Sequence, residues 1–260
     1  MFFRLGHSKL KYTGERIVPC KPELTEAYYG HLIAYVFASQ YTMDRLVLDA
    51  GCGTGYGTNH LSKTARQAIG IDVSREAITY CRKNYARDNT DFVQMDATNM
   101  GFWNNVFDAI CSFQVVEHIR DYDRYLSQMK RILKPCGILV ISTPNKKTFN
   151  PYGKPTSFHF KEFYREEFEA LLREFFKEVE IYGQYKMIKE KRQRLIDALL
   201  RIGRSGMLNF MPLRLRKAIE ERLVHKIDNP ARYKLNDFTI IDDFVEKSSM
   251  NIIAVCRKPS

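Results

Sequence analysis

The stretch Leu46-Val-Leu-Asp-Ala-Gly-Cys-Gly-Thr-Gly-Tyr-Gly57 decides how this chain folds. Its apolar start predicts a buried strand, and glycines at positions 51, 53, 55 and 57 follow. Glycine is needed where a backbone takes a positive φ or approaches a ligand more closely than a Cβ allows. Residues 58–66 are expected to form a helix. A strand, a glycine turn and a helix start predict a ligand site with free backbone N–H groups at the carboxyl edge of a sheet.

The spacing of these glycines separates two kinds of nucleotide-binding turn. The dinucleotide fingerprint G-x-G-x-x-G needs a third glycine where this chain has Tyr56 or Thr58. The run that is present, Asp49-x-Gly51-x-Gly53-x-Gly55, resembles the first motif of class I S-adenosylmethionine (SAM)-dependent methyltransferases. A tight turn without a ligand is the structural alternative. The resemblance implies that the methionine part of the cofactor is wrapped by Asp49, Gly51, Cys52, Gly53 and Gly55.

A second apolar strand, residues 67–73, carries an acid at its tip. Asp72 lies 21 residues beyond Gly51. A carboxylate there can accept both hydrogen bonds from a ribose diol, a role common to NAD and SAM enzymes. We expect Asp72 and Val73 to contact a nucleoside cofactor. The alternative is that Asp72 caps the next helix, but Ser74 already suits that position.

A third strand, residues 91–95, also ends in an acid. Asp96 and Ala97 resemble the adenine-binding position of the methyltransferases, with the carboxylate accepting from the amino group and Ala97 donating its backbone N–H. An exposed turn aspartate is the alternative. Asp49, Asp72 and Asp96 then mark three successive strand tips on one edge of the sheet.

The resemblance continues through the fourth strand, residues 106–113. It implies that Gln114 meets the cofactor and that the loop up to His118 lies beside the methyl group and the acceptor. His118 suits a general base near neutral pH, although a Glu-His pair also holds a loop in place. His159, in a polar and aromatic loop after the fifth strand, is the second candidate base.

Residues 1–44 precede the core as an N-terminal cap segment. The run Thr13-Gly-Glu-Arg-x-Val-Pro, followed by His31-x-x-x-Tyr35, resembles the lead-in of a bacterial methyltransferase subgroup related to polysaccharide and quinone methylation. The resemblance implies that Arg16 meets the cofactor carboxylate, for which a guanidinium offers bidentate donors. An ordinary solvated charge is the alternative for Arg16.

The expected fold is α/β: a Rossmann-like, seven-stranded, mostly parallel sheet with helices on both faces. Residues 45–185 and 248–260 form the SAM-binding domain, and the last strand, 251–257, inserts antiparallel as the resemblance implies. Residues 186–247 interrupt it as a basic helical insertion with helices over about 187–203 and 212–226. Positions 186–226 contain 12 Lys and Arg against 4 Asp and Glu. The insertion is either a cap with a solvated basic face or a surface for an anionic membrane or acceptor.

The composition argues against several other classes of protein. The 260 residues are 45% hydrophobic, which suits a globular chain, and no run of 18 apolar residues predicts a membrane span. Six scattered cysteines without a C-x-x-C pair argue against a zinc site or a disulfide framework, so no metal is expected. The N-terminus lacks the features of a signal peptide, and the cytoplasm is the expected location, either free or in peripheral contact with a membrane.

The sequence therefore predicts a methyltransferase that uses SAM, yields S-adenosylhomocysteine, and acts on a small-molecule, lipid or glycan acceptor. Three rivals stay open. The glycine spacing argues against a nicotinamide-dependent oxidoreductase. A nucleic-acid methyltransferase fits the basic segment, but Ser112-Phe-Gln-Val stands where Asp-Pro-Pro-Tyr is expected. The non-enzymatic rival is a module that binds the cofactor but catalyses no methyl transfer, because neither His118 nor His159 is established as a general base.

Overall fold

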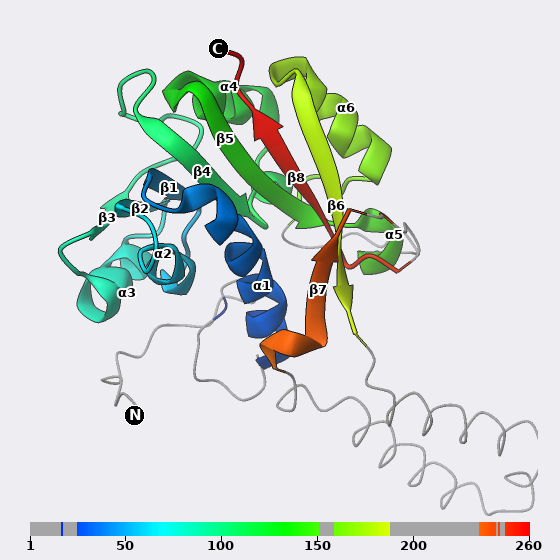
Figure 1. Cartoon of the computed structure of the whole chain (residues 1–260), viewed down its shortest axis with the longest axis horizontal. Helices are drawn as coiled ribbons and strands as arrows, with labels where there is room; N and C mark the ends of the chain where they lie inside the picture. Colours follow the sequence, from blue (N-terminus) through cyan, green and yellow to red (C-terminus); the bar gives the residue numbers. More distant parts are fainter. Residues whose placement is uncertain (1–16, 18–24, 151–158, 188–233, 243, 245–247) are drawn as a thin grey trace, which may run out of the picture.

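The computed structural model describes residues 17, 25–150, 159–187, 234–242, 244 and 248–260, and its strands form one eight-stranded sheet (Figure 1). The strands are β1 (Leu46–Ala50), β2 (Gln67–Asp72), β3 (Thr90–Gln94), β4 (Phe107–Phe113), β5 (Leu133–Pro144), β6 (Glu178–Lys186), β7 (Phe238–Ile241) and β8 (Asn251–Arg257). The helices are α1 (Thr25–Thr42), α2 (Tyr56–Leu61), α3 (Arg75–Tyr85), α4 (Tyr122–Ile132), α5 (Lys146–Phe149) and α6 (Arg165–Phe175), with 3-10 turns η2 (Val116–His118) and η5 (Leu235–Asp237).

The strand order is β3-β2-β1-β4-β5-β8-β6-β7. The first five strands are parallel, and β8 lies antiparallel between β5 and β6. This arrangement confirms the Rossmann-like class and the antiparallel last strand. The sheet has one strand more than the seven expected, because residues 238–241 pair with β6 as an antiparallel edge. These residues lie within the stretch expected to be the insertion, and buried Phe238 packs against Gly30 of α1.

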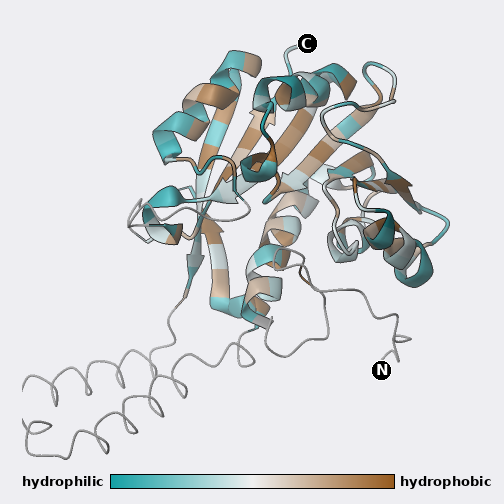
Figure 2. Ribbon diagram, turned by 180° about the vertical axis from the view of Figure 1, so that it is seen from behind, coloured by the Kyte–Doolittle hydropathy of each residue, from teal (hydrophilic) through white to brown (hydrophobic). Residues whose placement is uncertain are grey.

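Alternating residues of the strands build two hydrophobic cores, one on each face of the sheet. Leu48 of β1 and Leu139 of β5 face α4 and α6 on one side. Val47 and Val140, their neighbours in sequence, face α1 and α2 on the other. Figure 2 shows strands that are mostly hydrophobic beneath helices whose outer residues are hydrophilic. The period of two along each strand therefore places one apolar set on each face.

Two local features show how the sequence sets element boundaries. The Ser74 hydroxyl accepts a hydrogen bond from the backbone N–H of Ala77, which confirms Ser74 as the N-cap of α3. Farther along the chain, β5 begins at Leu133, directly after α4 ends at Ile132, and Cys136 takes a φ of 60° near the start of the strand.

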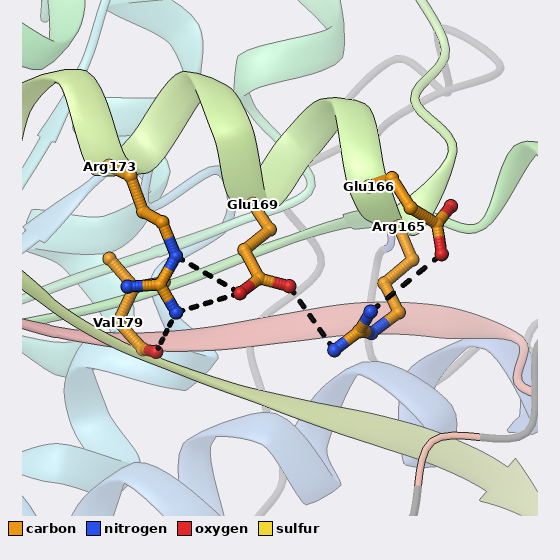
Figure 3. A network of polar contacts seen from close by, with 5 residues as sticks. All are labelled: Arg165, Glu166, Glu169, Arg173 and Val179. Atoms are coloured by element: carbon orange, nitrogen blue, oxygen red, sulfur yellow. Dashed lines mark hydrogen bonds and ion pairs between the residues drawn. The ribbon is translucent and has the colours of Figure 1, made fainter.

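An ion-pair network fixes α6 against the neighbouring strand (Figure 3). Glu169 accepts from Arg165 at 3.1 Å and from Arg173 at 2.7 Å, both one helical turn away. Arg173 also donates to the Val179 carbonyl of β6 at 3.2 Å. Such partly exposed pairs contribute only a few tenths of a kcal/mol each. Their main effect is to orient the helix that covers β6 and β8.

Several predicted features lie outside the described residues. Both basic helices of the insertion fall almost entirely within 188–233, and Arg16 lies in 1–16. Their roles stay predictions. Within the part of the chain that the structure describes, no helix has the length and apolar character needed to cross a membrane.

Candidate functional site

A cavity of about 320 Å³ opens at the carboxyl edge of the parallel strands. It lies where the strand order reverses, with β2 on one side of β1 and β4 on the other, the point at which open α/β sheets bind ligands. Loops after four different strands supply its walls. The lining residues are Gly51, Gly53, Asp72, Val73, Ser74, Met95, Asp96, Ala97, Gln114, Val115, His118 and Ile119.

The glycine turn after β1 provides a backbone surface without side chains. Gly51, Gly53 and Gly55 all take positive φ, at 82°, 52° and 79°. A Cβ on Gly51 would lie 2.4 Å from a methyl group of Val115, whereas a Cβ on Gly53 would meet nothing within 4 Å. Gly51 therefore permits close packing of the turn on the β4 loop. Gly53 keeps open the space that a cofactor needs.

The expectation of free N–H groups in this turn is wrong for four of its residues. The N–H groups of Gly51 and Cys52 donate to the Ile71 carbonyl of β2, and that of Gly55 donates to the Cys52 carbonyl. The Gly53 N–H donates to Asp72. Buried N–H groups need partners, and here β2 supplies the partners of Gly51, Cys52 and Gly53, whereas the turn itself supplies that of Gly55. The turn thus differs from a phosphate cradle, and it offers close approach to the backbone instead.

Asp72 connects the turn to the tip of β2. Its Oδ2 accepts from the Gly53 N–H at 3.0 Å, and its Oδ1 accepts from the Ser74 N–H at 2.8 Å. Each carboxylate oxygen can accept more than one hydrogen bond, so these contacts are compatible with a bound diol. The two backbone donors fix the orientation of the carboxylate at the cavity wall.

Asp96 and Ala97 lie at the tip of β3 on the same cavity. The Asp96 Oδ1 accepts from the backbone N–H and the hydroxyl of Thr98, at 2.7 and 2.8 Å. This turn holds the exposed carboxylate at the rim, while Ala97 is buried beside it. The arrangement fits a ring with an exocyclic amino group between the β2 and β3 tips.

Asp49 lies beneath the turn and does not line the cavity. It is 1% exposed, and it accepts from the Tyr35 hydroxyl at 3.1 Å and from the Thr58 hydroxyl at 2.6 Å. Burial raises the pKa of Asp49 to about 7, against the lowering effect of these hydrogen bonds. Asp49 thereby joins β1, α1 and α2. Cys52 and Gly55, also predicted to touch the cofactor, likewise do not line the cavity.

A second cavity, of about 440 Å³, adjoins the first. Gln114 lines both cavities. It takes a φ of 58°, and its backbone N–H and side-chain amide donate to the carbonyl and hydroxyl of Ser142. The other lining residues come from α1, β6, the start of β8 and the segments beside them: Ile17, Glu26, Ala27, Gly30, His31, Gln184, Met250 and Asn251.

His31 is held as a neutral imidazole at the wall of this second cavity. Its Nε2 lies 3.3 Å from the Phe113 carbonyl, and its Nδ1 lies 2.5 Å from the Tyr56 hydroxyl. Burial lowers the pKa of His31 to about 4, and the Phe113 carbonyl opposes the shift. The ring therefore donates through Nε2 and accepts at Nδ1. It supplies a polar surface without charge.

These two buried groups give stability opposite dependences on pH. The folded pKa of Asp49 exceeds its unfolded value, so its ionisation destabilises the fold as pH rises from about 4 to 7. The folded pKa of His31 lies below its unfolded value, so its protonation destabilises the fold as pH falls from about 6.5 to 4. Relative to the parent, the free energy of unfolding of Asp49→Asn should rise by about 3 kcal/mol as pH increases from about 4 to 7. Relative to the parent, that of His31→Gln should fall by a similar amount as pH increases from about 4 to 6.5. Urea titrations at several pH values measure both slopes. Equal slopes in the two variants would contradict the assignment.

His118 and His159, the two candidate bases, lie together. Their ring centroids are 4.9 Å apart. His118 lines the first cavity, whereas His159 does not. The His159 Nδ1 lies 3.3 Å from Glu162, and Glu117 accepts from the Thr143 hydroxyl at 3.3 Å. The pairing of Glu162 with His159 could have been suspected, because the two residues are three positions apart. The contact between the His118 loop and the His159 loop had no signal in the sequence.

The structure thus brings most of the predicted cofactor residues to one cavity. Asp72, Asp96 and Gln114 meet there although they are distant in sequence. Sequence reasoning missed part of the wall: Ser74, Met95, Val115 and Ile119. All four adjoin predicted residues or follow the same strand tips, so strand-tip position was the available signal. The second cavity was not predicted at all, because its residues come from four separate parts of the chain.

A Rossmann-like sheet with a glycine turn and two strand-tip carboxylates around its switch point defines a domain that binds a nucleoside cofactor. Residues 48–141 match the protein family described as a methyltransferase domain. These residues therefore form a methyltransferase domain similar to those of class I enzymes, whose cofactor is SAM. The cavity fits that cofactor, since Gly53 leaves open the space that a Cβ would fill.

Individual proteins and solved structures are also similar to this chain. Over 168 residues the chain is 34% identical to a probable S-adenosylmethionine-dependent methyltransferase of Mycolicibacterium smegmatis, and the match covers 64% of each protein. A fatty-acid O-methyltransferase of the same organism is 33% identical over 93 residues, which cover 35% of this chain and 34% of that protein. The solved structure of a SAM-dependent methyltransferase from Thermotoga maritima, a possible histamine N-methyltransferase, shares the fold. Its TM-score is 0.58 at 18% identity, over 89% of this chain and 92% of that one.

Proposed function

We propose that this chain transfers the methyl group of SAM to a small-molecule, lipid or glycan acceptor bound in the second cavity. The observation that carries the proposal is the shared wall at Gln114, which lines both the predicted cofactor cavity and its neighbour. Two adjoining cavities are what a two-substrate transfer requires, because the reacting groups must meet while each is held separately.

Each wall of the first cavity suits one part of the cofactor. The backbone of Gly51 and Gly53 admits the methionine part, the Asp72 carboxylate accepts from the ribose hydroxyls, and Asp96 with Ala97 receives the adenine. When bound, SAM supplies an electrophilic methyl group on a sulfonium. The chain contributes mainly orientation, which is the dominant requirement when the methyl donor is already activated.

The second cavity suits an uncharged acceptor group on an apolar body. Ile17, Ala27 and Met250 supply apolar surface. His31 is neutral, and the Glu26 carboxylate is paired with Lys186 at 2.5 Å. This chemistry favours a hydroxyl or similar group on a lipid or other partly apolar molecule, and the fatty-acid O-methyltransferase relative agrees with it. His118 and His159 would serve as the base if the acceptor must lose a proton.

Filling the second cavity separates acceptor binding from cofactor binding. Ala27 lines the second cavity and not the first, so Ala27→Phe should block the acceptor while leaving the SAM site intact. We expect labelled product to fall at least roughly tenfold, with SAM affinity within about twofold of the parent in calorimetry. Unchanged turnover in Ala27→Phe would place the acceptor elsewhere.

The acceptor class is found with methyl-labelled SAM and a cell extract divided into lipid, small-molecule, polysaccharide and nucleic-acid fractions. Asp72→Ala serves as the blank. Label in the lipid, glycan or small-molecule fraction supports the proposal. Label in nucleic acid would overturn the proposed acceptor class. SAM binding without label in any fraction would indicate a module that binds the cofactor but transfers no methyl group.

A further inference from the structure

One cluster of side chains beside the cofactor cavity is not explained by cofactor binding. Glu117, His118 and His159 each offer a ligand atom, and these three atoms lie within 4.8 Å of one another. Glu117 and His118 come from η2 after β4, whereas His159 arrives from the loop before α6. The tertiary fold therefore assembles a carboxylate and two imidazoles from separate segments.

We propose that Glu117, His118 and His159 bind a divalent transition-metal ion such as Zn²⁺. One carboxylate and two imidazoles form a ligand set typical of zinc and of related first-row metals. Metal–ligand bonds of about 2.0–2.2 Å hold neighbouring ligand atoms roughly 3.3 Å apart in a tetrahedral site. The three atoms thus need to approach one another by at most about 1.5 Å, a shift that small side-chain rotations can supply.

The surroundings of the cluster resemble those of a metal site. The His159 Nδ1 faces Glu162 at 3.3 Å, and the side-chain amide of Asn150 donates to the other oxygen of Glu162 at 2.9 Å. Metal-bound histidines commonly hold a carboxylate on one ring nitrogen in this way, which assigns the ligand role to the His159 Nε2. The Thr143 hydroxyl orients Glu117 in the same manner.

Burial and charge agree with a cation at this position. Glu117 is 1% exposed, and the side chain of Glu162 is 8% exposed. Burial of two carboxylates is costly unless positive charge lies nearby. A dication between Glu117 and the two imidazoles, with Glu162 behind one of them, would compensate both charges.

The proposed metal site also restricts the chemical class of the acceptor group. This step rests on the proposed function. Three protein ligands leave at least one coordination position open, as in catalytic zinc sites. His118 lines the cofactor cavity, so an acceptor held in the second cavity would reach the open position with an oxygen that extends past Gln114, which lines both cavities. An acceptor oxygen bound there loses its proton to solvent water more readily, so the metal ion would activate the acceptor in place of His118 or His159 acting as a base. The cluster therefore favours a hydroxyl or phenol as the methylated group.

The test measures metal binding without cofactor or acceptor. The full chain is freed of metal with a chelator and dialysed, then titrated with Zn²⁺ in a calorimeter and with Co²⁺ in a spectrophotometer. We expect one equivalent of Zn²⁺ and a visible Co²⁺ absorption band that reports nitrogen and oxygen ligands. Glu117→Gln and His159→Gln should weaken binding at least tenfold, and Glu162→Gln about tenfold or more through loss of orientation.

The control is His60→Gln, which removes a histidine of α2 outside the cluster and should bind as the parent does. Identical Zn²⁺ affinity in the parent and in a His118→Gln/His159→Gln double variant would overturn the site, as would a parent that binds no Zn²⁺. Circular dichroism of each variant establishes that the fold is kept. Metal binding in a chain that transfers no methyl group would support the site and refute the proposed function alone.

Discussion

Asp72→Ala is expected to weaken SAM binding by roughly 100-fold, about 2.7 kcal/mol. The variant removes the acceptor for both ribose hydroxyls. It also removes the partner of the Gly53 and Ser74 N–H groups, which the carboxylate holds at 3.0 and 2.8 Å. Charge-assisted hydrogen bonds of this kind are about twice as strong as neutral ones. Isothermal titration with SAM measures the loss directly.

Two further variants make this result specific. Asp72→Asn keeps the shape and one acceptor oxygen, so its affinity should fall between those of the parent and the alanine variant. Asp88→Ala removes an exposed aspartate that does not line the cavity and should bind SAM as the parent does. An Asp72→Ala affinity within about twofold of the parent would refute the ribose assignment.

Gly57→Ala is expected to cost about 3 kcal/mol of stability or to prevent folding, since overpacking of a rigid core commonly costs this much. The added Cβ would lie 1.9 Å from the Tyr35 ring, closer than any real contact. Tyr35 is 1% exposed and is held by its hydrogen bond to Asp49, so the ring has no room to retreat. Thermal denaturation should show a fall of at least about 6 °C for a chain of this size.

Glycines in other settings serve as controls for this effect. A Cβ on Gly101 would meet only a methionine methyl at 4.0 Å, so Gly101→Ala should change the melting temperature little. Gly53→Ala meets no atom within 4 Å but has a φ of 52°, and its cost should be about 1–2 kcal/mol. Equal melting temperatures for Gly57→Ala and the parent would show that the helix shifts away from Tyr35.

The cavity at the strand tips could be predicted because most of its lining residues belong to local patterns. Asp72 and Asp96 end apolar runs, and parallel strands bring such ends to one edge of a sheet. The glycine spacing excluded the dinucleotide turn from the sequence alone. Ser74 was recognisable as a helix cap because its role depends on residues three positions away.

Asp49 shows where this reasoning failed. Its place in the motif suggested contact with the cofactor, yet its carboxylate is buried against Tyr35 and Thr58. Side chains alternate between the two faces of a strand, and the residues that cover each face come from elsewhere in the chain. No local sequence pattern indicated whether α1 or the cofactor would cover the Asp49 carboxylate.

The sequence by itself determined the class of fold, the position of the glycine turn and the strand-tip acids, because all depend on residues close together in the chain. Only the tertiary structure decided that β7 extends the sheet, that Gln114 lines two cavities, and that His159 meets Glu117 and His118. These features join segments tens of residues apart. Their geometry depends on how helices and loops pack on the sheet, and apolar periodicity does not specify that packing.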